Sequence, residues 1–139
     1  MSWIYNGSEL TEAPKDAVGY IYRIDINNAF YIGLKRFYTH RKVNKGKKEL
    51  ALQDGRASKK KLVTKESNWK NYCSSSETVK QLVEEGYPPL RTILRICYSL
   101  KELSYYENKY LYANIEEPDN LNENLSGKYF RKEIEEWIR

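Results

Sequence analysis

The sequence predicts an α+β domain with a small, mostly antiparallel, three-stranded sheet flanked by helices. Residues 18–25 and 30–33 are rich in β-branched and aromatic side chains and enclose an Asn-Asn turn, which is typical of a β-hairpin. Residues 90–98 form a third run of this kind, and apolar side chains recur at helical spacing elsewhere. We expect the 139 residues to form a single domain, because a chain of this length can bury a core without disulfides or metal ions.

The segment after the hairpin is polar and basic. We expect a helix at about 35–41 and then a lysine-rich excursion at 42–66 that is mostly loop, with one short helix near 49–53. Ser74 and Glu77 have the spacing of a capping box, which predicts that the next helix starts there.

The last third of the chain is predicted to be mainly helical. Ser99 and Glu102 repeat the capping-box spacing after the third strand, and an apolar stripe continues to about Ile115. After a polar turn, apolar side chains return at helical spacing, so we expect a C-terminal helix at 128–139.

The cysteines, the histidine and the hydropathy exclude several classes of protein. Two cysteines, Cys73 and Cys97, and one histidine, His40, are too few for a zinc finger or zinc ribbon, and we expect two free thiols. No apolar run approaches the ~20 residues of a membrane span, and the first residues lack a signal-peptide pattern. We therefore expect a cytoplasmic protein without a membrane partner.

Positive charge is concentrated in one part of the chain. Residues 41–70 hold 11 Lys or Arg and 3 Asp or Glu, a net charge of +8, whereas the remainder holds 13 basic and 16 acidic side chains. Such a cluster indicates binding of a polyanion such as nucleic acid, although a solvated lysine-rich loop gives the same pattern.

Two tyrosines of the hairpin are predicted to be diagonal neighbours. A turn at 27–28 places Tyr31 opposite Ile24 and Tyr22 opposite Gly33. The two phenol rings then share one side of the sheet, with backbones roughly 7–8 Å apart. The missing side chain of Gly33 would leave a gap for a ligand, and a tyrosine pair that only packs is the alternative.

One carboxylate falls on the apolar side of the predicted 99–115 helix. At about 100° per residue, Glu107 lies within the stripe formed by Leu103, Tyr110 and Leu111. A buried carboxylate must be paired, protonated or bound to a metal ion, because desolvation of a lone charge is costly. A salt-bridged glutamate at the edge of the stripe is the alternative.

In combination, these residues resemble the GIY-YIG nuclease family, and in particular its small stand-alone, phage-type members. Tyr20-Ile21-Tyr22 is similar to the family's first triplet, with tyrosine in place of the leading glycine, and Tyr31-Ile32-Gly33 matches the second. Arg41 stands at the family's arginine position, and Glu107 at its metal-binding glutamate. Segment 68–76 also resembles a stretch of the phage-type members.

The resemblance implies a DNA endonuclease that hydrolyses phosphodiester bonds with one Mg²⁺ or Mn²⁺ ion and no organic cofactor. Glu107 would hold the ion, which would polarise the phosphate. Tyr22 would accept or relay the proton of the attacking water, and Tyr31 would help to orient that water. Asn122, or else Asn124, would be the family's asparagine, and Asn122 would position the ion-binding region or hold a tyrosine hydroxyl.

The resemblance also implies cations around the phosphate. Arg41 would stabilise the developing charge, an effect of ~10²–10³ in rate by analogy with other anion-stabilising donors. Lys35 and Arg41 would lower the pKa of the tyrosines, and His40 would donate or shuttle a proton. Which of Lys35, Arg36, His40 and Arg41 is the decisive cation stays open.

The lysines of the basic cluster would bind DNA phosphates without contacting bases. About five such contacts would give a slope of log affinity against log salt concentration near −4 to −5. The expected contacts are Lys42, Lys45, Lys47, Lys48, Arg56, Lys59, Lys60, Lys61, Lys65 and Lys70. The preferred target, the number of strands cut and the oligomeric state stay open.

Other functions fit these residues less well. A single histidine argues against an HNH nuclease. Glu107 and Lys109 fit half of a PD-(D/E)xK motif, but on a helix the two side chains point about 200° apart. The main alternative is a non-catalytic nucleic-acid-binding module that uses the 41–70 cluster, and a degenerate nuclease fold used for protein interaction is another.

Overall fold

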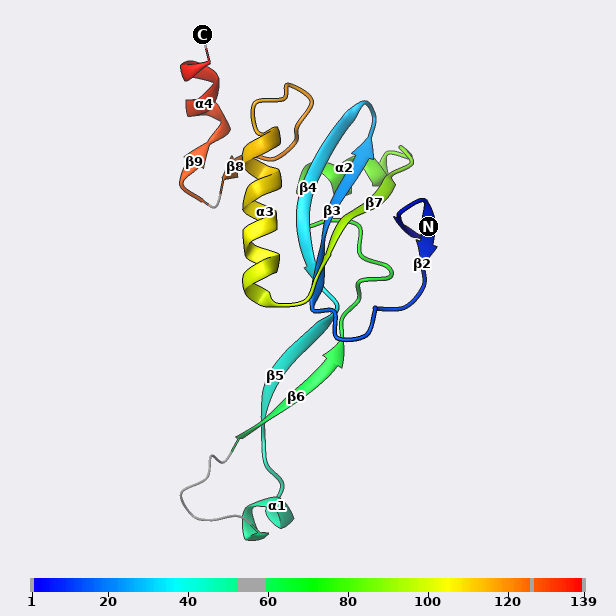
Figure 1. The fold of residues 1–139 in the computed structure, drawn as a ribbon, viewed down its shortest axis with the longest axis vertical. Coiled ribbons are helices and arrows are strands. Elements are labelled where there is room, and N and C mark those ends of the chain that lie inside the picture. The colour runs from blue at the N-terminus through cyan, green and yellow to red at the C-terminus, as the bar shows by residue number, and fades with distance from the viewer. Residues whose placement is uncertain (1, 53–59, 126, 139) are drawn as a thin grey trace. The chain divides into compact units, whose positions relative to one another are not determined.

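The computed structural model describes residues 2–52, 60–125 and 127–138 (Figure 1). The chain divides into two compact units. The first comprises Met1–Phe37 and Asn68–Arg139, and the second comprises Tyr38–Ser67. None of the helices in the described part of the chain has the length and apolar character needed to cross a membrane.

The first unit is built on a five-stranded mixed sheet, so the predicted α+β class is confirmed and the predicted three-stranded sheet is wrong. The strands lie in the order β2-β1-β7-β3-β4, and the described pairs are antiparallel except β1–β7. Their bounds are β1 Trp3–Tyr5, β2 Ser8–Leu10, β3 Gly19–Ile26, β4 Ala29–Arg36 and β7 Leu90–Cys97. The two unpredicted strands form a hairpin around Asn6 and Gly7, which both have positive φ. Asn-Gly is a hairpin signal, but strands of three residues show too little alternation to be recognised.

The central hairpin of β3 and β4 has the predicted register. Tyr22 lies opposite Gly33, and Ile24 lies opposite Tyr31. The turn residues 27 and 28 have φ values of 50° and 63°, as a type I′ turn requires. Asparagine tolerates this backbone conformation, so the Asn-Asn pair fixes the register from the turn.

The helices of the first unit begin near the predicted positions. Their bounds are α2 Glu77–Glu84, α3 Leu100–Asn114 and α4 Arg131–Trp137. Ser99 caps α3 as predicted, because its Oγ accepts a hydrogen bond from the Glu102 N–H at 3.0 Å. The cap of α2 is Ser76 and not Ser74, whose Oγ accepts from the Ser76 N–H at 2.9 Å and is therefore engaged before the helix begins.

The C-terminal helix is shorter than the predicted 128–139. A small sheet of β8 (Asn124–Leu125) and β9 (Tyr129–Phe130) precedes it. Ile134 is buried, whereas Trp137 is 60% exposed, so only part of the predicted apolar stripe packs against the core.

The two sides of the sheet bury different side chains. On the side covered by α3, the core consists of Ile21, Phe30, Ile32, Cys97, Leu103, Leu111, Ile115, Leu125 and Ile134 (Figure 1). The other side is an aromatic cluster, defined here as Trp3, Tyr20, Tyr22, Phe37 and Trp69. Its rings pack with centroids 5.0–6.2 Å apart, and each residue is at most 1% exposed.

The second unit, which we call the basic ribbon, is a pair of antiparallel strands, β5 (Tyr38–Asn44) and β6 (Lys60–Glu66), with the short helix α1 (Lys47–Leu52) in the connection. The side chains of both strands are mainly exposed. An isolated pair of strands buries little apolar surface and is only marginally stable by itself in water.

The helix predicted at 35–41 is wrong, and so is the mainly irregular structure predicted at 42–66. The end of β4 pairs with the start of β3, and residues 38–44 pair continuously with β6. No apolar alternation marks these strands, so their pairing and not their local sequence decides the structure. The short helix near 49–53 is confirmed in part as α1, and residue 53 lies outside the described residues.

We predict that Gly33→Ala destabilises the first unit. A Cβ at this position would lie 2.5 Å from the Tyr22 hydroxyl oxygen and 2.7 Å from its Cζ, so the buried ring would have to move. Overpacking of this kind costs about 1–3 kcal/mol, which urea denaturation will measure. Gly46→Ala is the control, because a Cβ there would meet no atom within 4 Å. Equal stability of the two variants would contradict the placement of Tyr22.

Candidate active site

A pocket of about 420 Å³ beside β4 collects side chains from several parts of the first unit. Tyr31 comes from β4, Glu107 from α3 and Asn122 from the segment after α3. The start of α2 also contributes, through Ser75, Ser76, Glu77 and Thr78. The structure therefore brings together three of the predicted site residues that are far apart in the sequence.

Backbone hydrogen bonds hold the strand at Phe30, the residue before Tyr31. The Phe30 N–H donates to Asp119 O at 2.9 Å, and the Leu121 N–H donates to Phe30 O at 2.7 Å. The segment after α3 thereby pairs with β4 in a parallel bridge. This bridge brings the segment that follows α3 next to Tyr31.

The Asn122 carboxamide continues this pairing. Its Oδ1 accepts from the Ile32 N–H at 2.9 Å, and its Nδ2 donates to Ile32 O at 2.8 Å. Asn122 is 6% exposed, and its own N–H donates to Asn120 Oδ1 at 2.8 Å. Asn122 therefore fixes β4 through its backbone. Asn124 also lines the pocket, where its Oδ1 accepts from the Gly127 N–H at 2.9 Å.

Glu107 is a half-buried carboxylate on α3. Burial raises the pKa of its carboxyl above the ordinary value, because desolvation disfavours the charged form. Within residues 2–52, 60–125 and 127–138, no basic side chain forms an ion pair with it. A carboxylate in this state is suited to bind a cation that enters the pocket.

Tyr31 is half-buried, and its hydroxyl oxygen lies 3.2 Å from Ser75 Oγ. Burial raises the pKa of this hydroxyl, the hydrogen bond with Ser75 lowers it, and the carboxylates of Glu107 and Glu123 raise it. Because the net direction is upward, Tyr31 is a neutral phenol at neutral pH. It can therefore donate or accept a hydrogen bond in the pocket.

Tyr22 is fully buried next to Tyr31, with ring centroids 6.2 Å apart. Its phenol covers Gly33, so the gap predicted there is filled by Tyr22 itself. Burial raises the pKa of the Tyr22 hydroxyl far above its ordinary value, and the prediction that cations lower it is wrong. Tyr72 and Ser74 influence this pKa, but no described residue meets hydrogen-bond geometry with the hydroxyl.

Lys35 approaches the tyrosines from the end of β4. Its Nζ lies 4.1 Å from the centroid of the Tyr72 ring, which lies 5.9 Å from that of Tyr22. Burial lowers the pKa of Lys35. Lys35 thus contacts the aromatic side of the sheet through Tyr72 and is not part of the pocket wall.

His40 and Arg41 lie on β5 in the basic ribbon, where adjacent residues face opposite sides. His40 Nδ1 lies 2.8 Å from Thr64 Oγ1, and Arg41 is exposed opposite Val63. The predicted roles of Arg41 in stabilising the phosphate and of His40 in donating a proton stay predictions.

The comparison with known families covers nearly the whole chain. A family model described as "Putative endonuclease segE, GIY-YIG domain" matches residues 3–134. The chain belongs to this GIY-YIG family. No curated protein and no solved structure gives a match.

In this GIY-YIG domain, the two triplets lie side by side on β3 and β4. Tyr22 of the first triplet pairs with Gly33 of the second, and only glycine leaves space for the ring that covers it. Gly19 is similarly confined, since a Cβ there would lie 2.5 Å from Lys35 O. Tyr20, which stands in place of the family's leading glycine, is fully buried in the aromatic cluster.

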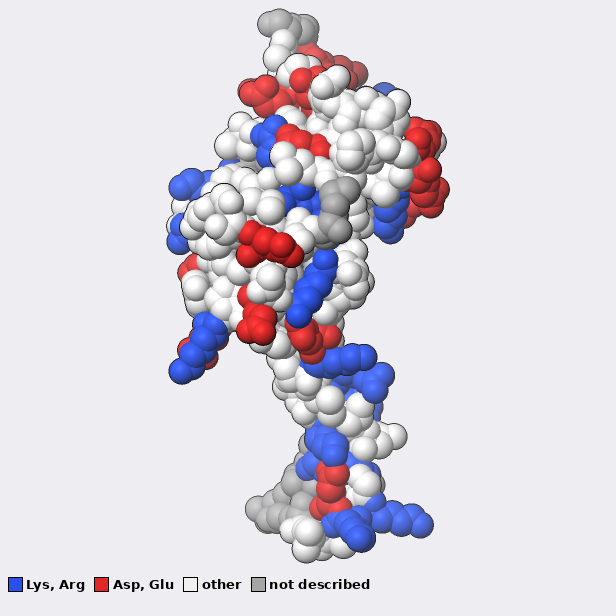
Figure 2. Space-filling view, turned by 90° about the vertical axis from the view of Figure 1, so that its right-hand side faces the viewer, with Lys and Arg blue, Asp and Glu red and all other residues white. Residues whose placement is uncertain are grey.

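Most lysines predicted to contact DNA lie on the basic ribbon of this GIY-YIG chain. Those described there are Lys42, Lys45, Lys47, Lys48, Lys60, Lys61 and Lys65. Figure 2 shows that Lys and Arg predominate on the visible face of this unit. Lys61 is paired with Glu49, and Lys70 belongs to the first unit, where its Nζ lies 5.8 Å from the Trp69 ring centroid. Arg56 and Lys59 lie outside the described residues.

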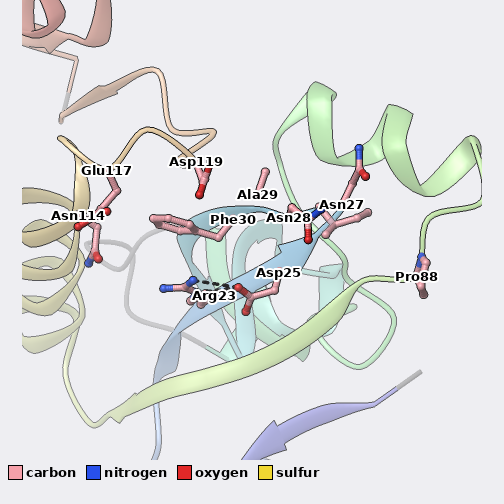
Figure 3. Close-up of a pocket in the computed structure, with 11 residues that line it drawn as sticks. Arg23, Asp25, Asn27, Asn28, Ala29, Phe30, Pro88, Asn114, Glu117 and Asp119 are labelled. Atoms are coloured by element: carbon pink, nitrogen blue, oxygen red, sulfur yellow. Dashed lines mark hydrogen bonds and ion pairs between the residues drawn. The ribbon is translucent and has the colours of Figure 1, made fainter.

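A second pocket, of about 540 Å³, lies at the turn between β3 and β4 (Figure 3). Arg23 is paired with Asp25 at 3.0 Å, and its guanidinium carbon lies 4.0 Å from the Phe30 ring centroid. Glu117 and Asp119 line the same pocket. Because its cation is already paired and none of the predicted site residues lines it, we assign the candidate site to the smaller pocket.

Ser75 was missed by the sequence analysis as a residue of the pocket, and Tyr72 adjoins the site without lining it. Tyr72 packs against Tyr22, and Ser75 lies within hydrogen-bond distance of Tyr31. Both belong to segment 68–76, whose resemblance to phage-type members was the available signal. The sequence alone does not show which of its serines faces the hairpin.

We predict that Glu107→Gln stabilises the GIY-YIG domain at neutral pH. Since the folded-state pKa of Glu107 is raised, wild-type stability falls as the pH rises through that pKa, and the variant removes this loss. Urea denaturation should show the variant to be more stable at pH 7 and equal to the wild type below about pH 4, where a free Glu is also protonated.

The control for this measurement is Glu116→Gln, at an exposed position after α3, which should leave stability unchanged at both pH values. A loss of stability in Glu107→Gln at pH 7 would mean that the ionised carboxylate has a stabilising partner, contrary to the assignment above.

Proposed function

We propose that this protein is a metal-dependent endonuclease that hydrolyses DNA phosphodiester bonds, with its active site in the pocket lined by Tyr31, Glu107 and Asn122. One observation carries the proposal: a half-buried carboxylate, without an ion-pair partner among the described residues, shares a pocket with the tyrosine of the second family triplet. Membership of an endonuclease family supports the reaction class and the DNA substrate.

The pocket residues fit a hard divalent cation, which GIY-YIG nucleases generally use. Mg²⁺ takes oxygen ligands, commonly one or two carboxylates together with water and phosphate oxygens. Glu107 would hold the ion, and Glu77 and Glu123 supply further carboxylates to the pocket. The described residues contain no group of three acidic, His or Cys side chains suited to a metal, which is compatible with an ion completed by substrate and water. When bound, Mg²⁺ or Mn²⁺ would polarise the phosphate and stabilise the leaving oxygen.

Tyr31 is the tyrosine placed to touch the attacking water, because it lines the pocket whereas Tyr22 is fully buried. As a neutral phenol, Tyr31 would accept a hydrogen bond from the water and so orient it. Tyr22 would support the Tyr31 ring from the aromatic cluster, and its buried hydroxyl, which has no hydrogen-bond partner among the described residues, offers no path for a proton. Asn122 would keep this strand in place through its bonds to Ile32.

The cationic side chains would act on the phosphate. Arg41 would neutralise the charge that develops at phosphorus, and His40 would donate or shuttle a proton. Lys35 contacts the aromatic side of the sheet through Tyr72.

The basic ribbon would bind the DNA backbone. Strand alternation places Arg41, Lys61 and Lys65 on one of its faces. The major groove of B-DNA accepts a two-stranded ribbon, and lysine contacts to phosphates give affinity that depends little on sequence. An exposed ribbon of this charge is better suited to bind duplex DNA than to bind a small anion.

We predict that purified protein cuts plasmid DNA in Mg²⁺ or Mn²⁺ and that Glu107→Ala abolishes cutting while DNA binding persists. Loss of a group that merely supports a metal ligand costs about 10- to 100-fold, so loss of the ligand itself should exceed about 100-fold. Glu116→Ala is the control and should cut normally. Binding without cutting by the wild type in either metal would instead establish a non-catalytic nucleic-acid-binding module.

We predict that the double variant Lys61→Gln/Lys65→Gln weakens duplex binding mainly at low salt. Each lost phosphate contact reduces the slope of log affinity against log salt by about 0.9, so the slope should become shallower by about 2. Fluorescence anisotropy over a salt series measures it. Lys101→Gln/Lys132→Gln, at exposed positions of α3 and α4, removes the same charge and should leave the slope unchanged. An unaltered slope in the ribbon variant would exclude phosphate contacts by these lysines.

A further inference from the structure

Three consecutive serines precede α2, and the structure gives each a different environment. Ser74 is 3% exposed, and its Oγ accepts from the Ser76 N–H at 2.9 Å. Ser76 caps the helix, with its Oγ accepting from the Val79 N–H at 3.3 Å. Ser75 is exposed, and its Oγ lies 3.2 Å from the Tyr31 hydroxyl oxygen. Ser75 is therefore the serine whose hydroxyl contacts a side chain of the pocket, whereas the hydroxyls of Ser74 and Ser76 bind the backbone at the start of α2.

The segment that carries Ser75 is anchored at several points. Trp69 is fully buried, and its carbonyl accepts a hydrogen bond from Trp3 Nε1 at 2.7 Å. Further along, the Arg91 guanidinium donates to Tyr72 O at 2.6 Å. Two anchors before Ser75 in the chain and the α2 cap after it thus fix the backbone around Ser75. A hydroxyl on such a fixed backbone can orient a partner at low entropic cost.

We propose that Ser75 is a positioning residue of the active site, whose hydroxyl fixes the Tyr31 hydroxyl for its contact with the attacking water. The proposal rests on the proposed nuclease function and adds to it a residue outside the two triplets. In this arrangement the Ser75 O–H donates to the phenolic oxygen. Tyr31 keeps its own proton and its second lone pair for groups in the pocket.

The charges near Tyr31 explain why such a donor is useful. Tyr22 and Tyr72 lie on its aromatic side, and the carboxylates of Glu107 and Glu123 act on it from the pocket. Burial and these carboxylates raise the pKa of Tyr31, whereas the hydrogen bond from Ser75 lowers it. Glu77 adds a third carboxylate to the same pocket. A donor to the phenolic oxygen makes the Tyr31 O–H a better hydrogen-bond donor to groups in the pocket and holds its direction.

The test compares Ser75→Ala with Ser75→Thr, which restores a hydroxyl at the same position. We expect Ser75→Ala to lower kcat about 3- to 10-fold, the effect of a single neutral hydrogen bond, with KM for DNA unchanged. The basic limb of the kcat–pH profile should move to higher pH, and Ser75→Thr should restore both. Ser104→Ala, at an exposed position on α3, is the control and should match the wild type.

A second measurement keeps this proposal separate from the nuclease proposal. In protein with tyrosine labelled by ¹³C at Cζ, the Tyr31 signal is identified by its loss in Tyr31→Phe. Ser75→Ala should shift that signal and raise its titration midpoint, even if the protein cuts no DNA. A Tyr31 signal that is the same in Ser75→Ala and the wild type overturns the proposal, and so does a kcat loss that Ser75→Thr fails to restore.

Discussion

The candidate site depends on how the last strand of the sheet is completed. The backbone of β4 beyond Tyr31 would otherwise present an N–H and a carbonyl to solvent, and the carboxamide of Asn122 binds both groups of Ile32. The neighbouring bonds between Phe30 and the 119–121 segment complete the same edge. This pairing joins the strand that carries Tyr31 to the segment after α3. As a result, a phenol from the hairpin and a carboxylate from a helix share one pocket.

Two groups of the candidate site lack partners in the described part of the fold. The Tyr22 hydroxyl is buried without a hydrogen-bond partner in the described chain, and Glu107 is half-buried without an ion pair there. Both conditions oppose stability, because desolvated polar groups lose their water without a replacement. The surrounding aromatic cluster and the apolar core under α3 offset this cost. Active sites commonly concentrate such groups, since a bound ion or substrate supplies the missing partner.

Features of this fold and site were predictable from the sequence where they depend on neighbouring residues, and were not predictable where they depend on residues far apart in the chain. The Tyr22–Gly33 register was predictable, because a two-residue Asn-Asn turn and strand alternation are local. The position of Glu107 was predictable from helical periodicity. The strands of the basic ribbon were not, since their exposed polar side chains carry no alternation and their structure depends on pairing between distant residues. The pKa of Tyr22 was predicted in the wrong direction, because the depth of burial is set by Trp3 and Tyr72, which come from elsewhere in the chain.

The exposed side chains of the basic ribbon have a consequence for divergence. Residues of β6 are exposed throughout, and α1 has no buried residue among those described, so few substitutions there would disturb packing. Tyr31, Gly33 and Asn122, by contrast, are each held by specific neighbours. Substitutions can therefore change the charge of the ribbon without disturbing the packing of the hairpin. Related chains are expected to vary in ribbon length and charge far more than in the hairpin.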